Sequence, residues 1–135
     1  MARRAAAPGQ SLVIFAKNKK RLSAFYRRTL GLEAAEEETS HDLLVGAGIE
    51  LVIHAIPRRY SVDIVITRPP QVREDTPLKP VFAVSDLDAV RTAAKASGGF
   101  LKPVEAAWQI RGYTVLDGWD PEGNVVQFRQ RNKKD

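Results

Sequence analysis

The 135-residue chain holds 44% hydrophobic and 27% charged residues, an ordinary balance for a globular domain that buries a core. It has no cysteine, which excludes a disulfide framework, a thiolate nucleophile and thiolate metal ligands. The net charge is +5, and no apolar run approaches the roughly 20 residues that a membrane span requires. Residues 1–9 end in Pro8-Gly9 and lack the apolar core of a secretory signal, so we expect a disordered leader and a cytoplasmic protein.

The first half of the chain predicts a strand, a helix and three further strands. Residues 11–16 form an apolar run of strand length. Residues 19–30 carry apolar side chains at helical spacing, with Asn18 able to cap the helix and Gly31 placed to end it. Strands are expected over residues 33–38, 41–45 and 49–56.

The second half repeats this order. A strand is expected over residues 78–84, a helix after Asp86 that ends at Gly98-Gly99, and strands over 101–104, 113–119 and 124–129. A constant offset places Asn18 on Asp86 and Gly31 on Gly99. We therefore expect modules at 10–57 and 78–130, a linker at 58–77 with one short strand candidate over 62–66, and a basic tail at 131–135.

Three segments carry a resemblance to a known family. They are Leu22-Ser23-Ala24-Phe25-Tyr26 leading into Leu30-Gly31-Leu32, then Val84-Ser85-Asp86-Leu87-Asp88-Ala89, and then Asp120-Pro121-Glu122-Gly123-Asn124-Val125-Val126. In this order the chain resembles the glyoxalase/bleomycin resistance protein/dioxygenase superfamily, also called the vicinal oxygen chelate superfamily, over about residues 11–130. The resemblance implies an α+β fold in which two tandem βαβββ modules form a curved mixed sheet around a concave cavity.

The resemblance also implies where a divalent metal would bind. Metal-using members of the superfamily supply a His or Gln at the start of each module's first strand and a Glu near each last strand. The matching positions here hold Ser11, Lys79, Glu50 and Gln127. A neutral serine is a poor ligand and an ammonium has no lone pair to give, so we predict no bound metal and no cofactor. We further expect Lys79 to pair with Glu50 where the metal would have been.

Strand alternation adds further residues to the predicted cavity. Phe15 shares a face with Ser11, His54 shares one with Glu50, and Arg129 shares one with Gln127, whereas Leu12, Ile14, Phe82, Val84, Val126 and Phe128 should pack under the helices. His54 is either a general base or displaced metal ligand, or a half-buried histidine with a hydrogen-bonded ring. The predicted cavity consists of Ser11, Phe15, Glu50, His54, Lys79, Trp108, Arg111, Tyr113 and Gln127, and no catalytic residue is assigned.

Trp108, Arg111 and Tyr113 have two interpretations. The aromatic rings can stack on a flat ligand while Arg111 pairs with an anionic group, or the rings can cover the core and a dimer interface. We predict a metal-free protein that binds or sequesters a small organic molecule, as antibiotic-binding resistance proteins of the superfamily do, and that forms a homodimer. The alternative is a divalent-metal-dependent lyase, isomerase or dioxygenase with ligands displaced to His54 and Glu50. Nucleic acid is the weakest interpretation, because no aromatic-rich strand accompanies the basic clusters.

Overall fold

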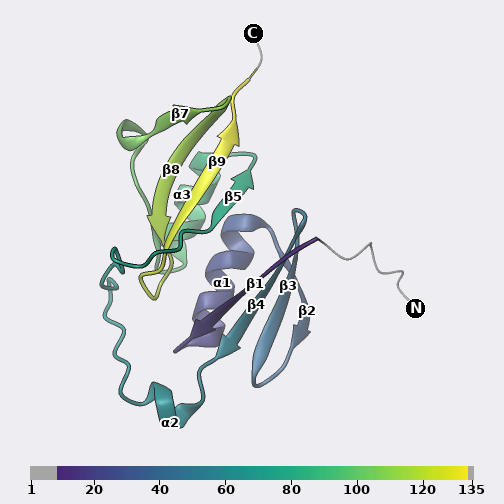
Figure 1. Cartoon of the computed structure of the whole chain (residues 1–135), viewed down its shortest axis with the longest axis vertical. Coiled ribbons are helices and arrows are strands. Elements are labelled where there is room, and N and C mark those ends of the chain that lie inside the picture. Colours follow the sequence, from purple (N-terminus) through teal and green to yellow (C-terminus); the bar gives the residue numbers. More distant parts are fainter. Residues whose placement is uncertain (1–8, 134–135) are drawn as a thin grey trace, which may run out of the picture.

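The structure is a computed structural model that describes residues 9–133. Residues 1–8 of the predicted leader and the last two residues of the predicted tail lie outside the described part. The chain folds into two βαβββ-type modules, each with one main helix behind a mixed sheet (Figure 1). This confirms the predicted α+β fold class. None of the described helices is long and apolar enough to cross a membrane.

The first module contains β1 (Gln10–Ala16), α1 (Lys19–Leu30), β2 (Glu33–Glu37), β3 (His41–Gly46) and β4 (Ile49–Ala55). Its sheet has the order β1-β4-β3-β2, with β1 parallel to β4. The Asn18 side chain accepts a hydrogen bond of 3.0 Å from the Arg21 amide, and Gly31 ends α1 in the left-handed conformation with φ of 66°. Both ends of α1 are therefore where the sequence predicts them.

The second module contains β5 (Val81–Val84), α3 (Leu87–Ala96), β6 (Phe100–Leu101), the 3-10 turn η1 (Val104–Ala106), β7 (Trp108–Ile110), β8 (Tyr113–Trp119) and β9 (Val125–Arg131). Its sheet has the order β5-β9-β8-β6, and β7 pairs with the free part of β8. The Asp86 side chain caps α3 by accepting from the amides of Asp88 and Ala89. The same local rules thus shape both halves of the chain.

Four local predictions differ from the structure. Strand β5 begins at Val81 because Pro80 has no N–H to donate, although its carbonyl still accepts from the Gln127 amide. Strand β6 has two residues, since Pro103 and the following 3-10 turn end it. Strand β7 was not predicted. Within the described chain, residues 62–66 form no strand, and the linker contains instead the short helix α2 (Arg58–Ser61).

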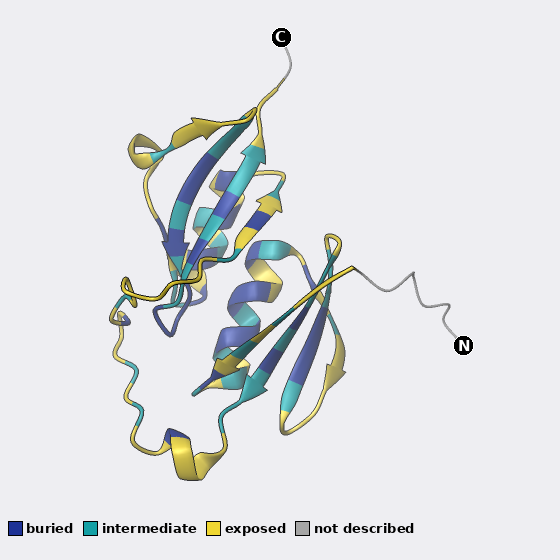
Figure 2. Ribbon diagram, in the orientation of Figure 1, coloured by how far each residue is buried: buried dark blue, intermediate teal, exposed yellow. Residues whose placement is uncertain are grey.

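The alternation of side chains along the strands is as predicted. Leu12, Ile14 and Val84 pack against the core, and Phe82, Val126 and Phe128 belong to it. The opposite faces carry exposed apolar side chains, including Val13 at 48%, Phe15 at 61% and Val81 at 44% exposure. Each sheet therefore has one face covered by a helix and one open face (Figure 2).

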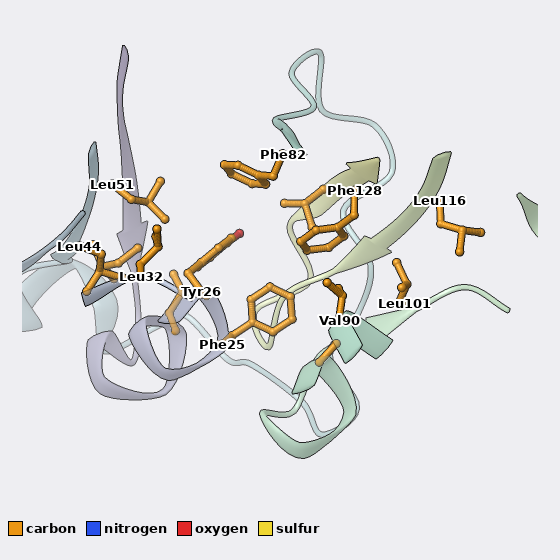
Figure 3. Close-up of a cluster of buried hydrophobic side chains, with 14 of the residues drawn as sticks. Phe25, Tyr26, Leu32, Leu44, Leu51, Phe82, Val90, Leu101, Leu116 and Phe128 are labelled. Carbon is orange, nitrogen blue, oxygen red and sulfur yellow. The ribbon is translucent and has the colours of Figure 1, made fainter. Parts of the chain in front are cut away.

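The core is continuous between the modules. Helix α1 packs against α3, and its Phe25 and Tyr26 are fully buried. The Tyr26 ring meets Phe82 of β5 edge-on at a centroid distance of 6.1 Å. Figure 3 shows Phe25 and Tyr26 between Leu51 of the first module and Phe128 of the second. The shared core makes the two modules one packing unit.

The turn between β8 and β9 ties the modules together by hydrogen bonds. Tyr26 Oη donates to Asp120 Oδ2 at 2.7 Å, and Asp120 Oδ1 accepts from the amides of Glu122 and Asn124. The buried Glu122 carboxylate accepts from the amides of Lys17 and Asn18 at 2.9 and 2.8 Å, just before α1. A turn of the second module thus satisfies backbone donors of the first.

Burial dominates the titration of this hydrogen-bonded pair. Desolvation raises the pKa of Asp120, an effect that hydrogen bonds from Tyr26, Asn124 and the Glu122 amide partly offset. Desolvation, reinforced by the charge of Asp120, raises the pKa of Tyr26 well above its usual value. The Tyr26 hydroxyl therefore stays a donor to Asp120 over the whole physiological range.

Candidate functional site

The open face of the first module brings together four of the predicted site residues. Ser11 of β1 lies beside Glu50 of β4, and Phe15 lies beside His54 in the same parallel register. The Phe15 and His54 ring centroids are 5.6 Å apart. His54 Nδ1 donates to the Ala55 carbonyl at 2.9 Å, so its Nε2 faces away from that bond. His54 is half-buried and its ring is hydrogen-bonded, as expected for the second of its two predicted interpretations, a histidine with a structural role.

The open face of the second module holds Lys79, Gln127, Tyr113 and Trp108. Asp117 of β8 lies beside Gln127 of β9, and its carboxylate accepts from Lys79 Nζ at 3.0 Å and from Gln127 Nε2 at 3.2 Å. Among the described residues, Lys79 forms its ion pair with Asp117 and none with Glu50. The predicted Glu50–Lys79 pair is therefore wrong within one chain, because the two residues belong to different modules and Lys79 reaches across β9 to Asp117 of β8.

Trp108 and Tyr113 share this face, whereas Arg111 does not join them. Trp108 of β7 pairs in register with Val115, two residues from Tyr113 on the same strand. Arg111 is exposed in the turn between β7 and β8, at a positive φ of 46°. Arg129, which is not among the predicted cavity residues, also lies on this face, and its guanidinium is 4.6 Å from the centroid of the Tyr113 ring. Strand alternation placed Arg129 on this face, but the sequence does not show its contact with Tyr113.

A cavity of about 410 Å³ opens at one end of this face. One wall is the linker between Val72 and Lys79, and the others are Lys102, Asp117, Gly118, Trp119 and Val125. Arg73, Lys79 and Lys102 give this cavity three basic side chains, against the acids Glu74 and Asp117. Part of the predicted linker thus forms a cavity wall rather than a simple spacer.

Gly123 fixes the linker against the second module. Its φ is +86°, and a Cβ at this position would lie 2.0 Å from the Gln71 carbonyl oxygen. The Gly123 carbonyl accepts from the Arg73 amide at 2.9 Å. Only glycine allows this close approach of the two backbones.

The residues at the implied metal positions do not fit a divalent cation. They offer one carboxylate, a serine hydroxyl and an amide, and the fourth position holds the Lys79 ammonium, paired with Asp117. The displaced set fits no better, because Val52 lies between Glu50 and His54 on β4 and roughly 13 Å of strand separates their Cα atoms. No group of three or more His, Asp or Glu residues suited to a metal occurs in the described part of the chain.

Comparisons with known proteins support the fold. No family model and no curated protein matches the chain. Among solved structures, a glyoxalase/bleomycin resistance protein/dioxygenase family enzyme from Burkholderia phytofirmans PsJN aligns with a TM-score of 0.63 and 18% identity, over 90% of this chain and 97% of that one. A mutant of the fosfomycin resistance protein FosX from Listeria monocytogenes, complexed with Mn(II) and a dihydroxypropylphosphonic acid, aligns with a TM-score of 0.64 and 14% identity, over 96% and 93%.

A third solved structure, of an integron cassette protein, also aligns with this chain. An integron cassette protein from the mobile metagenome of V. Cholerae aligns with a TM-score of 0.60 and 13% identity, over 96% of this chain and 98% of that one. These alignments span both modules at identities that establish the architecture alone. The chain therefore has the fold of the glyoxalase/bleomycin resistance protein/dioxygenase proteins.

Proposed function

We propose that this chain is a metal-independent protein that binds or sequesters a small organic molecule on the open faces of its sheets. The observation that carries the proposal is the position of the Lys79 ammonium. It lies 3.0 Å from the Asp117 carboxylate, which also accepts a hydrogen bond from the Gln127 side chain. A fixed positive charge at an implied ligand position repels a divalent cation. The FosX structure pairs this fold with Mn(II), whereas the donor set of this chain suits binding without a metal.

The open faces have the chemistry of a small-molecule site. Phe15 and Trp108 expose 61% and 40% of their surface, and half-buried His54 and Tyr113 add polar ring atoms. The cavity of about 410 Å³ has the size of many small-ligand sites. The cavity is lined by charged as well as apolar side chains, which favours a compact organic ligand that itself carries polar groups.

A homodimer is part of the proposal. Val13, Phe15 and Val81 expose 44–61% of their surface on faces that a second copy would cover. Exposed apolar side chains on sheet faces are typical of interaction sites, and a two-fold arrangement lets the same faces meet reciprocally. Sedimentation equilibrium is expected to give twice the chain mass of 15.0 kDa.

Metal analysis tests metal independence. The protein, purified without chelator, is expected to contain far less than one equivalent of zinc, nickel, iron or manganese per chain. Adding these ions is expected to leave the melting temperature unchanged, since a ligand stabilises only the state that binds it. One equivalent of metal that is lost in a Glu50→Gln variant would refute the proposal. Native mass spectrometry of the same sample detects a co-purified organic molecule directly.

A further inference from the structure

Two guanidinium groups surround one tyrosine on the open face of the second module. Arg129 and Arg131 lie two residues apart on β9 and therefore point to the same side of the sheet. Their Cζ atoms lie 4.6 and 4.8 Å from the centroid of the Tyr113 ring, and Arg131 Nη2 donates to Tyr113 Oη at 3.0 Å. The tyrosine holds both cations in place.

Within residues 9–133, this pair of cations has no carboxylate at ion-pair distance. Among the described residues, neither Arg129 nor Arg131 forms an ion pair, and the buried Nε of Arg129 has no hydrogen-bond acceptor. Asp117, on the same face, is already shared by Lys79 and Gln127. A buried donor without an acceptor is costly, and neighbouring like charges repel. An oxyanion on the accessible side of the Arg129 guanidinium would neutralise this charge.

The neighbours of Arg129 define what accompanies the anion. In the register of the sheet, Ala83, Arg129, Val115 and Trp108 form one row across four strands. The small Ala83 leaves space on one side of the guanidinium, and the indole of Trp108 lies two strands away, roughly 10 Å. A ligand that binds Arg129 through a charged group can thus place a flat apolar body against Trp108.

We infer that Arg129 anchors the oxyanion of a small organic acid, a carboxylate or a phosphonate, whose flat apolar body extends toward Trp108. The inference rests on the proposed function, because it names the class of ligand that the open face of the second module would bind. The planar guanidinium of Arg129 is only half-buried, and its two Nη groups are suited to parallel hydrogen bonds to such a group.

Titration of the full chain with three probes tests this inference. Benzoate and phenylphosphonate carry the two candidate oxyanions, and benzamide has nearly the same shape as benzoate without the charge. We expect at least one anion to shift the Nε–Hε resonance of Arg129 and to quench tryptophan fluorescence, and we expect benzamide to bind about tenfold more weakly or worse. The stronger of the two anions identifies the head group.

Variants separate the anchor from general charge effects. Arg129→Gln is expected to weaken anion binding about tenfold or more, and Arg129→Lys to recover part of it. Arg59→Gln is the matched control, because Arg59 also lies over a tyrosine ring, at 4.7 Å from the centroid of Tyr60, but on exposed α2.

Several results would overturn the inference. Equal binding of benzoate and benzamide, no binding of either anion, or unchanged affinity in Arg129→Gln would each refute it. These failures leave the metal analysis untouched, so metal-independent binding could still hold. Conversely, a stoichiometric metal together with Arg129-dependent anion binding would refute the proposed function alone.

Discussion

At the scale of single residues, Asp120 is the clearest case of a buried charge with a structural role. Its carboxylate accepts from Tyr26, from the Asn124 side chain and from two backbone amides. Desolvation still raises its pKa, because hydrogen bonds offset only part of the loss of water. The residue that joins the modules therefore stabilises the folded chain more when it is protonated.

An Asp120→Asn variant tests this pH dependence. Between the usual pKa of about 3.8 and the raised folded value, the folded state binds more protons than the unfolded state. The free energy of unfolding of the wild type, minus that of the variant, should therefore fall as pH rises from about 3 through the folded pKa. Urea denaturation over pH 3 to 7 measures the difference, and a difference that grows with pH would contradict the assignment.

At the scale of elements, Gly123 joins the β8–β9 turn to the linker. Gly123→Ala is expected to destabilise the fold by about 2–4 kcal/mol, because the new Cβ meets the Gln71 carbonyl and the backbone has a positive φ. Gly112→Ala is the matched control, since φ is +82° there but nothing lies within 4 Å, and only about 1 kcal/mol is expected. Equal losses of stability in the two variants, measured by thermal and urea unfolding, would show that the contact between Gly123 and the linker is unimportant.

Elements with local signals were predictable from the sequence, and those without were not. Asn18, Gly31 and Asp86 mark helix ends through hydrogen bonds and backbone angles that neighbouring residues determine. Strand β7 is exposed along its length and exists only because β8 is long enough to pair with it. The residues at 62–66 have strand-like composition but lack a partner strand among the described residues, so tertiary pairing decides against them.

At the scale of the whole molecule, the faces of the site were predictable but its pairings were not. Alternation correctly separated Phe15 and Gln127 from the core. The partner of Lys79 was not predictable, because Asp117 reaches it only through the register of β5, β9 and β8. The same non-local register brings Arg129 over Tyr113. Contacts of this kind depend on how distant strands meet, which no local pattern encodes.

Association of whole chains can be tested with two exposed aromatics. Phe15 and Tyr60 are both 61% exposed, on the open face and on α2 respectively. Phe15→Glu is expected to convert the dimer to a monomer without changing the circular dichroism spectrum, because a buried unpaired charge opposes the interface. Tyr60→Glu should remain dimeric in sedimentation equilibrium. Monomers in both variants, or dimers in both, would rule out the open face as the interface.

The linker residues that shape the cavity are not the residues that form the hydrophobic core. Residues 72–74 and 76–79 line the cavity, yet among the described residues their backbone pairs with the sheet through a single isolated bridge, from Arg73 to Asn124. Substitutions at exposed positions such as Glu74, Thr76 and Leu78 can therefore change the size and charge of the cavity while the shared hydrophobic core stays intact. Selection acting on this short stretch could retune ligand preference in small steps, with the architecture held constant.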